Sequence, residues 1–491
     1  MSDQRALLSG TAVNAGGLVA GVAAAFGVQL LIGRRLGPGG LGLVTVAVQV
    51  AFVASAGSRF GMDLAAVRQV AIDRGAGREE TLRSLVDRCA GLAFAVSIPV
   101  AALVAALSPL ADGYGRPIAI AAGSIPLAAA ANVYLGATRG LKAMAPTLWV
   151  FWIGQPLAWI ALAGVLFAAG GGVDAAVWSY VVSWLVAAVA ARALWRDATA
   201  GCGDRPATRE EVRDAIRFGL PRAPAALLAQ ALFWADLWVL SAFATRSEVG
   251  TYAAVGRVSQ VILLFVTSVN LMFAPFAADL YARGAHEQLD RLFKQATRWG
   301  LVATLPVVIV LAVAATDLLS AFGPEFAGGE SALRIMLAGQ LVNVLTGSVA
   351  FVLIMTGRTT LDLADNAIAV AVLVALAAPL SEAFGIEGAA IASAVAIGGV
   401  NLLRLVQVAR IVHITPYTRA DLRLALPAGA CVAAGIAVHL ALRDHGWPVD
   451  LAGTAAAALA AYAALLPSAL PPEERAVLAR LTRRITKRGP R

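Results

Sequence analysis

Residues 10–58 read GTAVNAGGLVAGVAAAFGVQLLIGRRLGPGGLGLVTVAVQVAFVASAGS and contain two apolar runs that a short basic, glycine-rich segment separates. The runs cover 10–32 and 42–58, and RRLGPGG at 34–40 lies between them. A helix of about 20 apolar residues crosses the roughly 30 Å of hydrocarbon in a bilayer. The first run is also much longer than the core of a signal peptide, so we expect it to be retained. We therefore predict two membrane helices joined by a short outer loop.

The same pattern continues along the chain of 491 residues, of which 59% are hydrophobic and 14% charged. A soluble domain carries about 25% charged residues, so a soluble enzyme is excluded. Three cysteines without paired spacing exclude a disulfide scaffold. The composition predicts an all-α integral membrane protein with about 14 transmembrane helices. The apolar runs lie near 10–32, 42–58, 89–111, 117–137, 147–169, 174–194, 221–243, 250–274, 299–319, 332–355, 362–383, 387–408, 425–442 and 448–467.

The distribution of basic residues predicts how these helices are oriented. The net charge is +9, and the chain has 39 Lys and Arg. With the N-terminus inside, 32 of them fall in inner segments, six in outer segments, and Arg257 lies within a span. Basic residues accumulate in cytoplasmic loops, so we predict that both termini are cytoplasmic and that the charge does not reflect nucleic-acid binding. The longer inner segments, 59–88, 195–220 and 275–298, have the helical spacing of amphipathic surface helices.

Short patterns recur in the two halves of the chain. Leu41-Gly42 corresponds to Val249-Gly250, Gly140 to Gly357, and residues 172–176 to residues 385–390. These patterns fall at equivalent places in two units of six spans, which predicts two pseudo-symmetric lobes related by an axis along the membrane normal. We assign residues 1–200 to an N-terminal six-helix lobe, 201–415 to a C-terminal six-helix lobe, 416–470 to transmembrane helices 13 and 14, and 471–491 to a basic cytoplasmic tail.

A resemblance to a known family accompanies the repeat. Residues 34–42 resemble the Arg-x-Leu-Gly-Pro-x-x-Tyr-Gly signature that follows the first helix of bacterial polysaccharide exporters, with Leu41 in place of the tyrosine. The chain is therefore similar, over nearly its whole length, to the O-antigen flippases and the wider multidrug/oligosaccharidyl-lipid/polysaccharide exporter superfamily. Further short matches follow in order at 60–68, 138–142, 234–236, 249–252, 322–326 and 355–358.

The resemblance implies a flippase that moves a polyprenyl-pyrophosphate-linked oligosaccharide, such as an O-antigen or exopolysaccharide repeat unit. It implies transport across the bacterial cytoplasmic membrane by alternating access, coupled to an ion gradient, with helices 13 and 14 forming part of a groove for the lipid tail. A lipid II flippase and a multidrug or metabolite antiporter of the same superfamily are alternatives. A membrane glycosyltransferase or polymerase is a third, although the large outer loop or surface carboxylate motif that it usually needs does not occur in the sequence.

Sequence motifs for catalysis are missing. Gly37, Gly39 and Gly42 spell G-x-G-x-x-G, but they follow a membrane helix and not a strand, so we exclude a dinucleotide site. The four histidines, at 286, 413, 439 and 445, share no metal-ligand spacing. We therefore expect a transporter and not an enzyme, without a metal or cofactor other than H⁺ or Na⁺ as the coupling ion.

Two charged side chains inside predicted spans are candidates for function, because charge is costly in a membrane. Asp236 in the seventh span is a candidate ion-coupling residue, or else an ion-pair partner of Arg257. Arg257 is always charged and suits an anionic pyrophosphate, unless it pairs with Asp236. Asp362 and Asp365 begin the eleventh span, and we expect them to be solvated.

The other candidate residues are arginines at the rims of the membrane and amides inside it. We expect the arginines to attract phosphate, and the amides either to bind sugar hydroxyls or to form hydrogen bonds between helices. The expected partners are the lipid-linked oligosaccharide, membrane lipids and polysaccharide polymerase machinery. The rim arginines are Arg34, Arg59, Arg139 and Arg298. The sugar path comprises Asn14, Asn132, Gln155, Gln340, Asn343 and Asn366.

Overall fold

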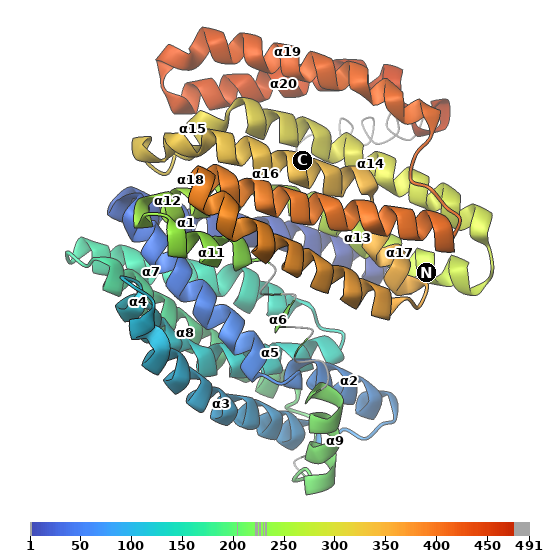
Figure 1. Cartoon of the computed structure of the whole chain (residues 1–491). Coiled ribbons are helices and arrows are strands. Elements are labelled where there is room, and N and C mark those ends of the chain that lie inside the picture. The colour runs from blue at the N-terminus through green and yellow to red at the C-terminus, as the bar shows by residue number, and fades with distance from the viewer. Residues whose placement is uncertain are drawn as a thin grey trace, which may run out of the picture. The chain divides into compact units, whose positions relative to one another are not determined.

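The computed structural model of the chain describes residues 2–203, 205–220, 224, 227, 228, 230 and 233–475. Side chains are described in these ranges except at 2–19, 268–272, 274, 275, 278, 282 and 359. Every regular element in this part of the chain is a helix, which confirms the predicted all-α class (Figure 1). The helices belong to two compact units, residues 1–254 with 370–389 and residues 255–369 with 390–491. The predicted lobe boundaries remain a prediction.

The first unit is built around α5, which lies against α1, α2, α3 and α8. Small residues on α5 allow this close packing. An added Cβ on Gly136 would come within 2.5 Å of the Asp63 carbonyl oxygen. Packing without a hydrophobic driving force depends on such close approach in membranes. The elements of this unit are α1 (Ser2–Ser58), α2 (Met62–Gly75), α3 (Leu82–Leu107), η1 (Ser108–Leu110), α4 (Gly115–Ala122), α5 (Ser124–Gly140), α6 (Ala145–Thr147), η2 (Leu148–Gly154), α7 (Gln155–Ala168), α8 (Val173–Ala198), α9 (Arg209–Gly219), α11 (Ala235–Phe243) and most of α12 (Arg246–Ser259).

The second unit contains the hairpin of α19 and α20, which covers the predicted spans 13 and 14. Figure 1 shows the two helices of the hairpin side by side, and both of them contact α14. Gly435 on α19 faces Ala458 of α20, and a Cβ added to this glycine would lie 3.5 Å from that methyl group, at an ordinary van der Waals distance. The remaining elements are α13 (Val261–Ala282), α14 (His286–Val313), α15 (Ala315–Ser320), η4 (Pro324–Gly329), α16 (Glu330–Thr346), α17 (Val349–Met355), α18 (Thr359–Ile411, shared by both units), η5 (Arg419–Leu424), α19 (Ala425–Leu442), η6 (Arg443–His445) and α20 (Trp447–Ala469).

Two of the longest helices change direction at a glycine. Gly37 inside α1 has φ 66° and ψ −176°, and Gly385 inside α18 has φ 58° and ψ −129°. Residues with a Cβ avoid this region, and Pro38 also removes a backbone donor next to the first kink. The predicted spans 10–32 and 42–58 are therefore two halves of α1. The spans 362–383 and 387–408 are likewise two halves of α18.

The kinks explain why fewer helices than predicted spans are found. Nine helices in the described ranges are long and apolar enough to cross a membrane, or up to eleven if two bent helix pairs each count as one span. Helices α1 and α18 each contain two predicted spans, and the run 221–243 lies partly outside the described residues. A multi-pass membrane fold is confirmed, while the number fourteen remains a prediction.

Two glycines at equivalent places in the predicted repeat contact each other. An added Cβ on Gly42 would lie 2.9 Å from the backbone nitrogen of Gly250, and one on Gly250 would lie 1.7 Å from the carbonyl oxygen of Pro38. Neither position has room for a side chain. The start of the second half of α1 is thus fixed directly against α12 within the first unit.

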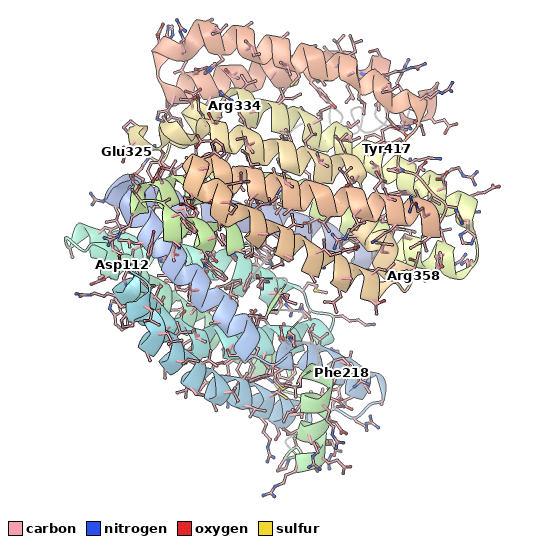
Figure 2. The ribbon with its side chains drawn as sticks, viewed as in Figure 1. Asp112, Phe218, Glu325, Arg334, Arg358 and Tyr417 are labelled. Atoms are coloured by element: carbon pink, nitrogen blue, oxygen red, sulfur yellow. The ribbon has the colours of Figure 1, made fainter. Side chains whose placement is uncertain are left out.

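Connections lie at alternate ends of the helices within each unit. Figure 2 shows Asp112, before α4, and Phe218, on α9, at opposite ends of the first unit. Glu325 in η4 and Arg358 before α18 likewise lie at opposite ends of the second unit. Asp112 and Glu325 belong to predicted outer segments, and Phe218 and Arg358 to inner ones. The arrangement within each unit agrees with the predicted alternation, and which side is cytoplasmic remains a prediction.

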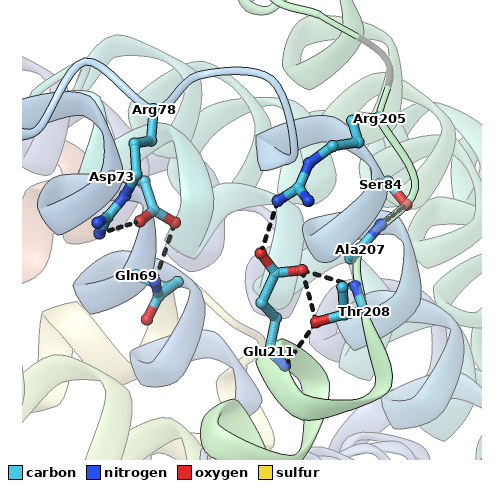
Figure 3. Close-up of polar contacts among 8 residues, drawn as sticks. All are labelled: Gln69, Asp73, Arg78, Ser84, Arg205, Ala207, Thr208 and Glu211. Atoms are coloured by element: carbon cyan, nitrogen blue, oxygen red, sulfur yellow. Dashed lines mark hydrogen bonds and ion pairs between the residues drawn. The ribbon is translucent and has the colours of Figure 1, made fainter.

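The inner segments of the first unit form short helices with well-defined ends. Thr208 and Glu211 make a capping box at the start of α9, in which the Thr208 hydroxyl accepts from the Glu211 backbone N–H and Glu211 accepts from the Thr208 backbone N–H (Figure 3). The backbone N–H of Ala207 donates to Ser84 Oγ at 2.9 Å, which attaches this segment to α3. Helix α9 also packs against α2. The predicted surface helix in 195–220 is therefore held firmly by the first unit.

Candidate functional site

Three charged side chains gather where α1, α2 and α5 meet, at the predicted inner end of the first unit. Arg59 follows α1 directly, Asp63 lies in the first turn of α2, and Arg139 lies in the last turn of α5. An ion pair of 3.5 Å joins Arg59 Nη1 to Asp63 Oδ2, and Arg139 interacts electrostatically with both residues. Two guanidinium groups and one carboxylate leave one excess positive charge. We call these three residues the arginine cluster.

The position of Arg59 follows from the turn that carries it. Phe60 and Gly61 both have positive φ, 49° and 67°, and an added Cβ on Gly61 would lie 2.4 Å from the Gly219 carbonyl oxygen. The turn is thus closed tightly against α9. Only 12% of the Arg59 side chain is exposed, and its Nε has no hydrogen-bond partner among the residues described. Burial lowers the pKa of this guanidinium, and the nearby Asp63 carboxylate raises it. An arginine nevertheless stays charged in a protein. The ion pair of 3.5 Å with Asp63 therefore neutralises the charge of Arg59 only in part.

Arg298, another predicted phosphate ligand, holds three protein groups in the second unit. Its Nε donates to Asp421 at 2.5 Å, and its Nη1 donates to Glu474 at 2.8 Å. Its Nη2 donates to Thr418 at 2.7 Å. The two carboxylates carry more negative charge than the single guanidinium carries positive charge. No excess positive charge is therefore left to bind an anionic ligand. We call these four residues the Arg298 cluster, and its geometry favours a structural role that ties α14 to η5 and to the residues after α20.

Asp236 and Arg257 each have a neutral partner in their own unit. Asp236 is buried in the first turn of α11, and its Oδ2 accepts from Tyr252 Oη at 2.7 Å. Arg257 on α12 donates to Gln260 at 3.2 Å, and its Nε has no hydrogen-bond partner in the described part of the chain. A phenol can hydrogen-bond to either protonation state of a carboxyl group, so this setting is compatible with ion coupling. The ion pair between Asp236 and Arg257 remains a prediction.

Arg34 lies in a different part of the first unit from the arginine cluster. It is exposed near the end of the first half of α1, shortly before the kink at Gly37. The arginine cluster lies at the opposite end of the second half of α1, after Ser58. Arg34 therefore remains a candidate for contact with phosphate at the predicted outer rim, and the structure does not place it beside Arg59.

The described amides of the predicted sugar path are hydrogen-bonded to other protein groups. Gln155 donates to Ser183 Oγ of α8 at 2.9 Å, which joins two helices. Asn132 donates to the carbonyl oxygen of Ala128 one turn earlier. Gln340 and Asn343 bond to each other at 3.3 Å. The side chain of Asn14 lies outside the described residues. These contacts fit the helix-packing alternative, and the sugar path remains a prediction.

A second group of buried charges was not anticipated from the sequence. Arg404 Nη2 in the second half of α18 donates to Asp362 at 2.7 Å and to Asn366 at 2.9 Å, both in the first half. Gln407 donates to Asp365 at 2.8 Å. The expectation that Asp362 and Asp365 are solvated is wrong for Asp365, which is 1% exposed. The kink at Gly385 turns the second half of α18 back along the first half, so that Arg404 contacts and covers Asp365.

A sequence signal for this group does exist. Asp362 and Asp365 are three residues apart, as are Arg404 and Gln407, so each pair lies on one face of its helix. The two carboxylates exceed the single guanidinium, so this group can attract cations but not phosphate. The arginine cluster is the group whose charge suits a phosphate.

Comparisons with known proteins agree with this fold. Residues 7–276, more than half of the chain, match the family described as polysaccharide biosynthesis protein, and residues 221–380 match the MatE family. Among solved structures, the fold is similar to the lipid II flippase MurJ in an inward closed conformation, with a TM-score of 0.70, 14% identity, and coverage of 94% of this chain and 97% of that one. It is also similar to an inward-facing multidrug resistance MATE family transporter of the MOP superfamily, with a TM-score of 0.67, 14% identity, and coverage of 80% and 94%.

Two curated relatives come from the archaeon Haloferax volcanii. The "Probable low-salt glycan biosynthesis flippase Agl15" is 27% identical over 166 residues, which is 33% of this chain and 34% of that protein. The "Probable flippase AglR" is 23% identical over 223 residues, which is 44% of this chain and 46% of that protein. The chain thus matches between a third and a half of the length of these relatives. Both are named as flippases and both are archaeal, so a bacterial membrane remains a prediction.

Proposed function

The chain belongs to the polysaccharide biosynthesis protein family, and we propose that it is a flippase that moves a polyprenyl-pyrophosphate-linked oligosaccharide between the leaflets of the cytoplasmic membrane by alternating access. The observation that carries this proposal is the arginine cluster, which combines burial with an excess positive charge and lies inside the matched residues 7–276. Pyrophosphate presents several anionic oxygens, and guanidinium groups bind such oxygens with two parallel hydrogen bonds.

The geometry of the cluster allows a phosphate to replace a weak internal contact. The 3.5 Å between Arg59 Nη1 and Asp63 Oδ2 is longer than the about 2.7–2.9 Å of a strong charge-assisted hydrogen bond. Asp63 therefore holds Arg59 loosely, and a pyrophosphate oxygen can compete for it. Arg139 on α5 supplies the second cation. Loading at the predicted inner end is the direction required for export of a lipid-linked sugar made in the cytoplasm.

Asp236 is the proposed coupling residue for H⁺ or Na⁺. Its carboxylate is buried and accepts from Tyr252, so binding or release of a proton changes the charge of a confined site. Such a change can shift the equilibrium between the two conformations of a transporter. The ionised carboxylate favours the conformation that admits water or a cation to the site.

The proposed substrate is tested with purified chain in liposomes. A fluorescent polyprenyl-pyrophosphate oligosaccharide is placed in both leaflets, and a membrane-impermeant enzyme reports its transfer. We expect the double variant Arg59→Ala, Arg139→Ala to abolish transfer. The matched control is Arg116→Ala, which removes an arginine whose side chain is 81% exposed at the predicted outer end. Equal transfer with and without wild-type chain would refute the proposal, and transfer of lipid II alone or of a drug alone would favour the corresponding rival.

Coupling is tested in the same liposomes with an imposed H⁺ or Na⁺ gradient. We expect Asp236→Asn to remove the dependence on the gradient, because the amide cannot ionise. Tyr252→Phe, which keeps the carboxylate but removes its hydrogen bond, should shift the ion concentration at half-maximal rate and retain coupling. Unchanged gradient-dependent transfer in Asp236→Asn would assign this carboxylate a purely structural role.

A further inference from the structure

A group of three potential metal ligands lies in the second unit, and none of the three residues is assigned a role in transport. Asp317 lies in the first turn of α15, His439 in the last turn of α19, and Asp450 in the first turn of α20. One ligand atom from each lies within 4.8 Å of the others. His439 Nδ1 is 2.9 Å from Asp450 Oδ2 and 3.5 Å from Asp317 Oδ2. The three residues are far apart in the sequence, and the four histidines show no metal-ligand spacing, so the sequence alone does not predict this group.

The hydrogen-bonding state of these atoms points to a missing ligand. Asp450 is 1% exposed, and its Oδ1 accepts from Thr454 at 3.0 Å, which turns Oδ2 toward the other two residues. Asp450 Oδ2, Asp317 Oδ2 and His439 Nδ1 are buried, and the described part of the chain offers these three atoms no polar partner other than one another. Nδ1 can carry one proton, which cannot point at both carboxylate oxygens. With both carboxylates ionised, the single Nδ1 proton leaves one buried oxygen unsatisfied, whereas a cation placed between the three atoms satisfies all of them.

The distances and donor types select the cation. Zinc bonds of about 2.0–2.2 Å in a tetrahedral site place neighbouring ligand atoms about 3.3 Å apart, and the distances of 2.9 Å and 3.5 Å lie on either side of this value. One imidazole nitrogen with two carboxylates suits zinc, whereas Ca²⁺ and Mg²⁺ prefer oxygen donors alone. The two negative charges match the charge of a divalent ion. The His439 side chain is 25% exposed, so water can complete the fourth position.

We propose that Asp317, His439 and Asp450 bind a zinc ion that fastens the α19–α20 hairpin to α15. The site lies at the predicted outer end of these helices, since α19 ends and α20 begins there. Helices α19 and α20 are the predicted spans 13 and 14, which do not belong to the predicted six-helix repeat. The zinc site would therefore attach this additional hairpin to α15 at a defined position. The proposal does not depend on the transported substrate.

The test measures zinc in the purified full-length chain. The protein is stripped with a chelator in detergent, equilibrated with ZnCl₂, desalted and analysed by mass spectrometry of its metal content. We expect about one zinc ion per chain, and zinc should raise the unfolding temperature of the stripped protein by several degrees, because a ligand that binds only the folded state stabilises it. A tenfold excess of Mg²⁺ or Ca²⁺ should not displace the zinc.

Variants locate the ion and keep the test independent of folding. His439→Ala and Asp317→Asn should lose both the zinc and its effect on the unfolding temperature. His445→Ala and Asp444→Asn are matched controls, because both residues are exposed in η6 of the same hairpin, and they should keep both. The proposal is overturned if the folded, unmodified chain retains no zinc, if Mg²⁺ or Ca²⁺ displaces it, or if the two control variants lose zinc as fully as the ligand variants.

Discussion

Arg59 and Arg298 are both buried, with 12% and 9% of their side chains exposed, yet their charges are satisfied very differently. Arg298 donates three hydrogen bonds to protein groups, one from each of its guanidinium nitrogens, and two of the three go to carboxylates. Arg59 has one loose ion pair and an Nε without a partner in the described residues. Burial alone therefore does not mark a ligand-binding arginine. The unused donors and the local charge balance separate a binding arginine from a structural one.

The largest expected effect is on folding, at Arg298. Arg298→Ala leaves the carboxylates of Asp421 and Glu474 buried without a cation, and we expect a loss of about 3–5 kcal/mol in the free energy of unfolding. Arg298→Lys should lose less, because it keeps the charge but not the planar arrangement of donors. Thermal unfolding in detergent measures both. A variant as stable as wild type that nonetheless fails to transport would remove the distinction between the two clusters.

The next effect is on transport, at Arg139. Arg139→Ala removes one of two cations from the arginine cluster, and a lost charge-assisted contact of about 1.5–3 kcal/mol lowers substrate affinity by roughly ten- to a hundredfold. We expect the unfolding temperature to stay close to that of wild type, because Asp63 keeps its contact with Arg59. Transfer rates at increasing substrate concentration, together with thermal unfolding, test this pairing. A large loss of stability with unchanged affinity would place Arg139 with the structural arginines.

The smallest effect extends the comparison to an exposed arginine. Arg205 Nη2 lies 3.0 Å from Glu211 Oε1, but 54% of the Arg205 side chain is exposed. Arg205→Ala should therefore lower the free energy of unfolding by less than about 1 kcal/mol. Thr208→Ala, which removes the cap of α9, should cost about 1 kcal/mol. Amide hydrogen exchange in α9 can resolve these differences. A larger loss in Arg205→Ala than in Thr208→Ala would show that exposure is a poor guide to the strength of such pairs.

The cap of α9 should also depend on pH. Hydrogen bonds from Thr208 lower the pKa of Glu211 below its ordinary 4.5. A carboxyl group with a lowered pKa in the folded state stabilises that state above its ordinary pKa, and the contribution is lost as the pH falls through the folded value. The difference in exchange between wild type and Glu211→Gln should therefore shrink between about pH 6 and about pH 3. A difference that grows in acid would contradict this assignment.

Local features could be predicted from the sequence, and distant pairings could not. The RRLGPGG segment at 34–40 predicted a break between two helical runs, and the kink lies at Gly37 within it, because the backbone preferences of glycine and proline act locally. The partners of Arg298 lie more than 100 residues away, at Asp421 and Glu474, and no periodicity connects them. Arg59, Arg139 and Arg298 therefore looked alike as rim arginines. Only the fold separates them.

The same limit applies to the other buried polar groups. Asp365 looked like an ordinary helix-start residue, because its partner Gln407 is reached only after the chain turns back at Gly385. His439 looked isolated for a similar reason, since Asp317 and Asp450 come from two other helices. In contrast, the capping box of Thr208 and Glu211 is visible as a four-residue pattern. Polar residues that meet across helices need the tertiary structure before a role can be assigned.

The kinks at Gly37 and Gly385 have a practical consequence for anyone who modifies this chain. At both points a single non-helical glycine separates two helices, so there is no loop that could receive an epitope tag or be cut by an added protease. The segment between α8 and α9 is different, because Gly201 and Gly203 lie outside any helix there. A fluorescent fusion partner inserted near Gly201 should be tolerated, whereas the same insertion at Gly37 should disrupt the kink that joins the two halves of α1.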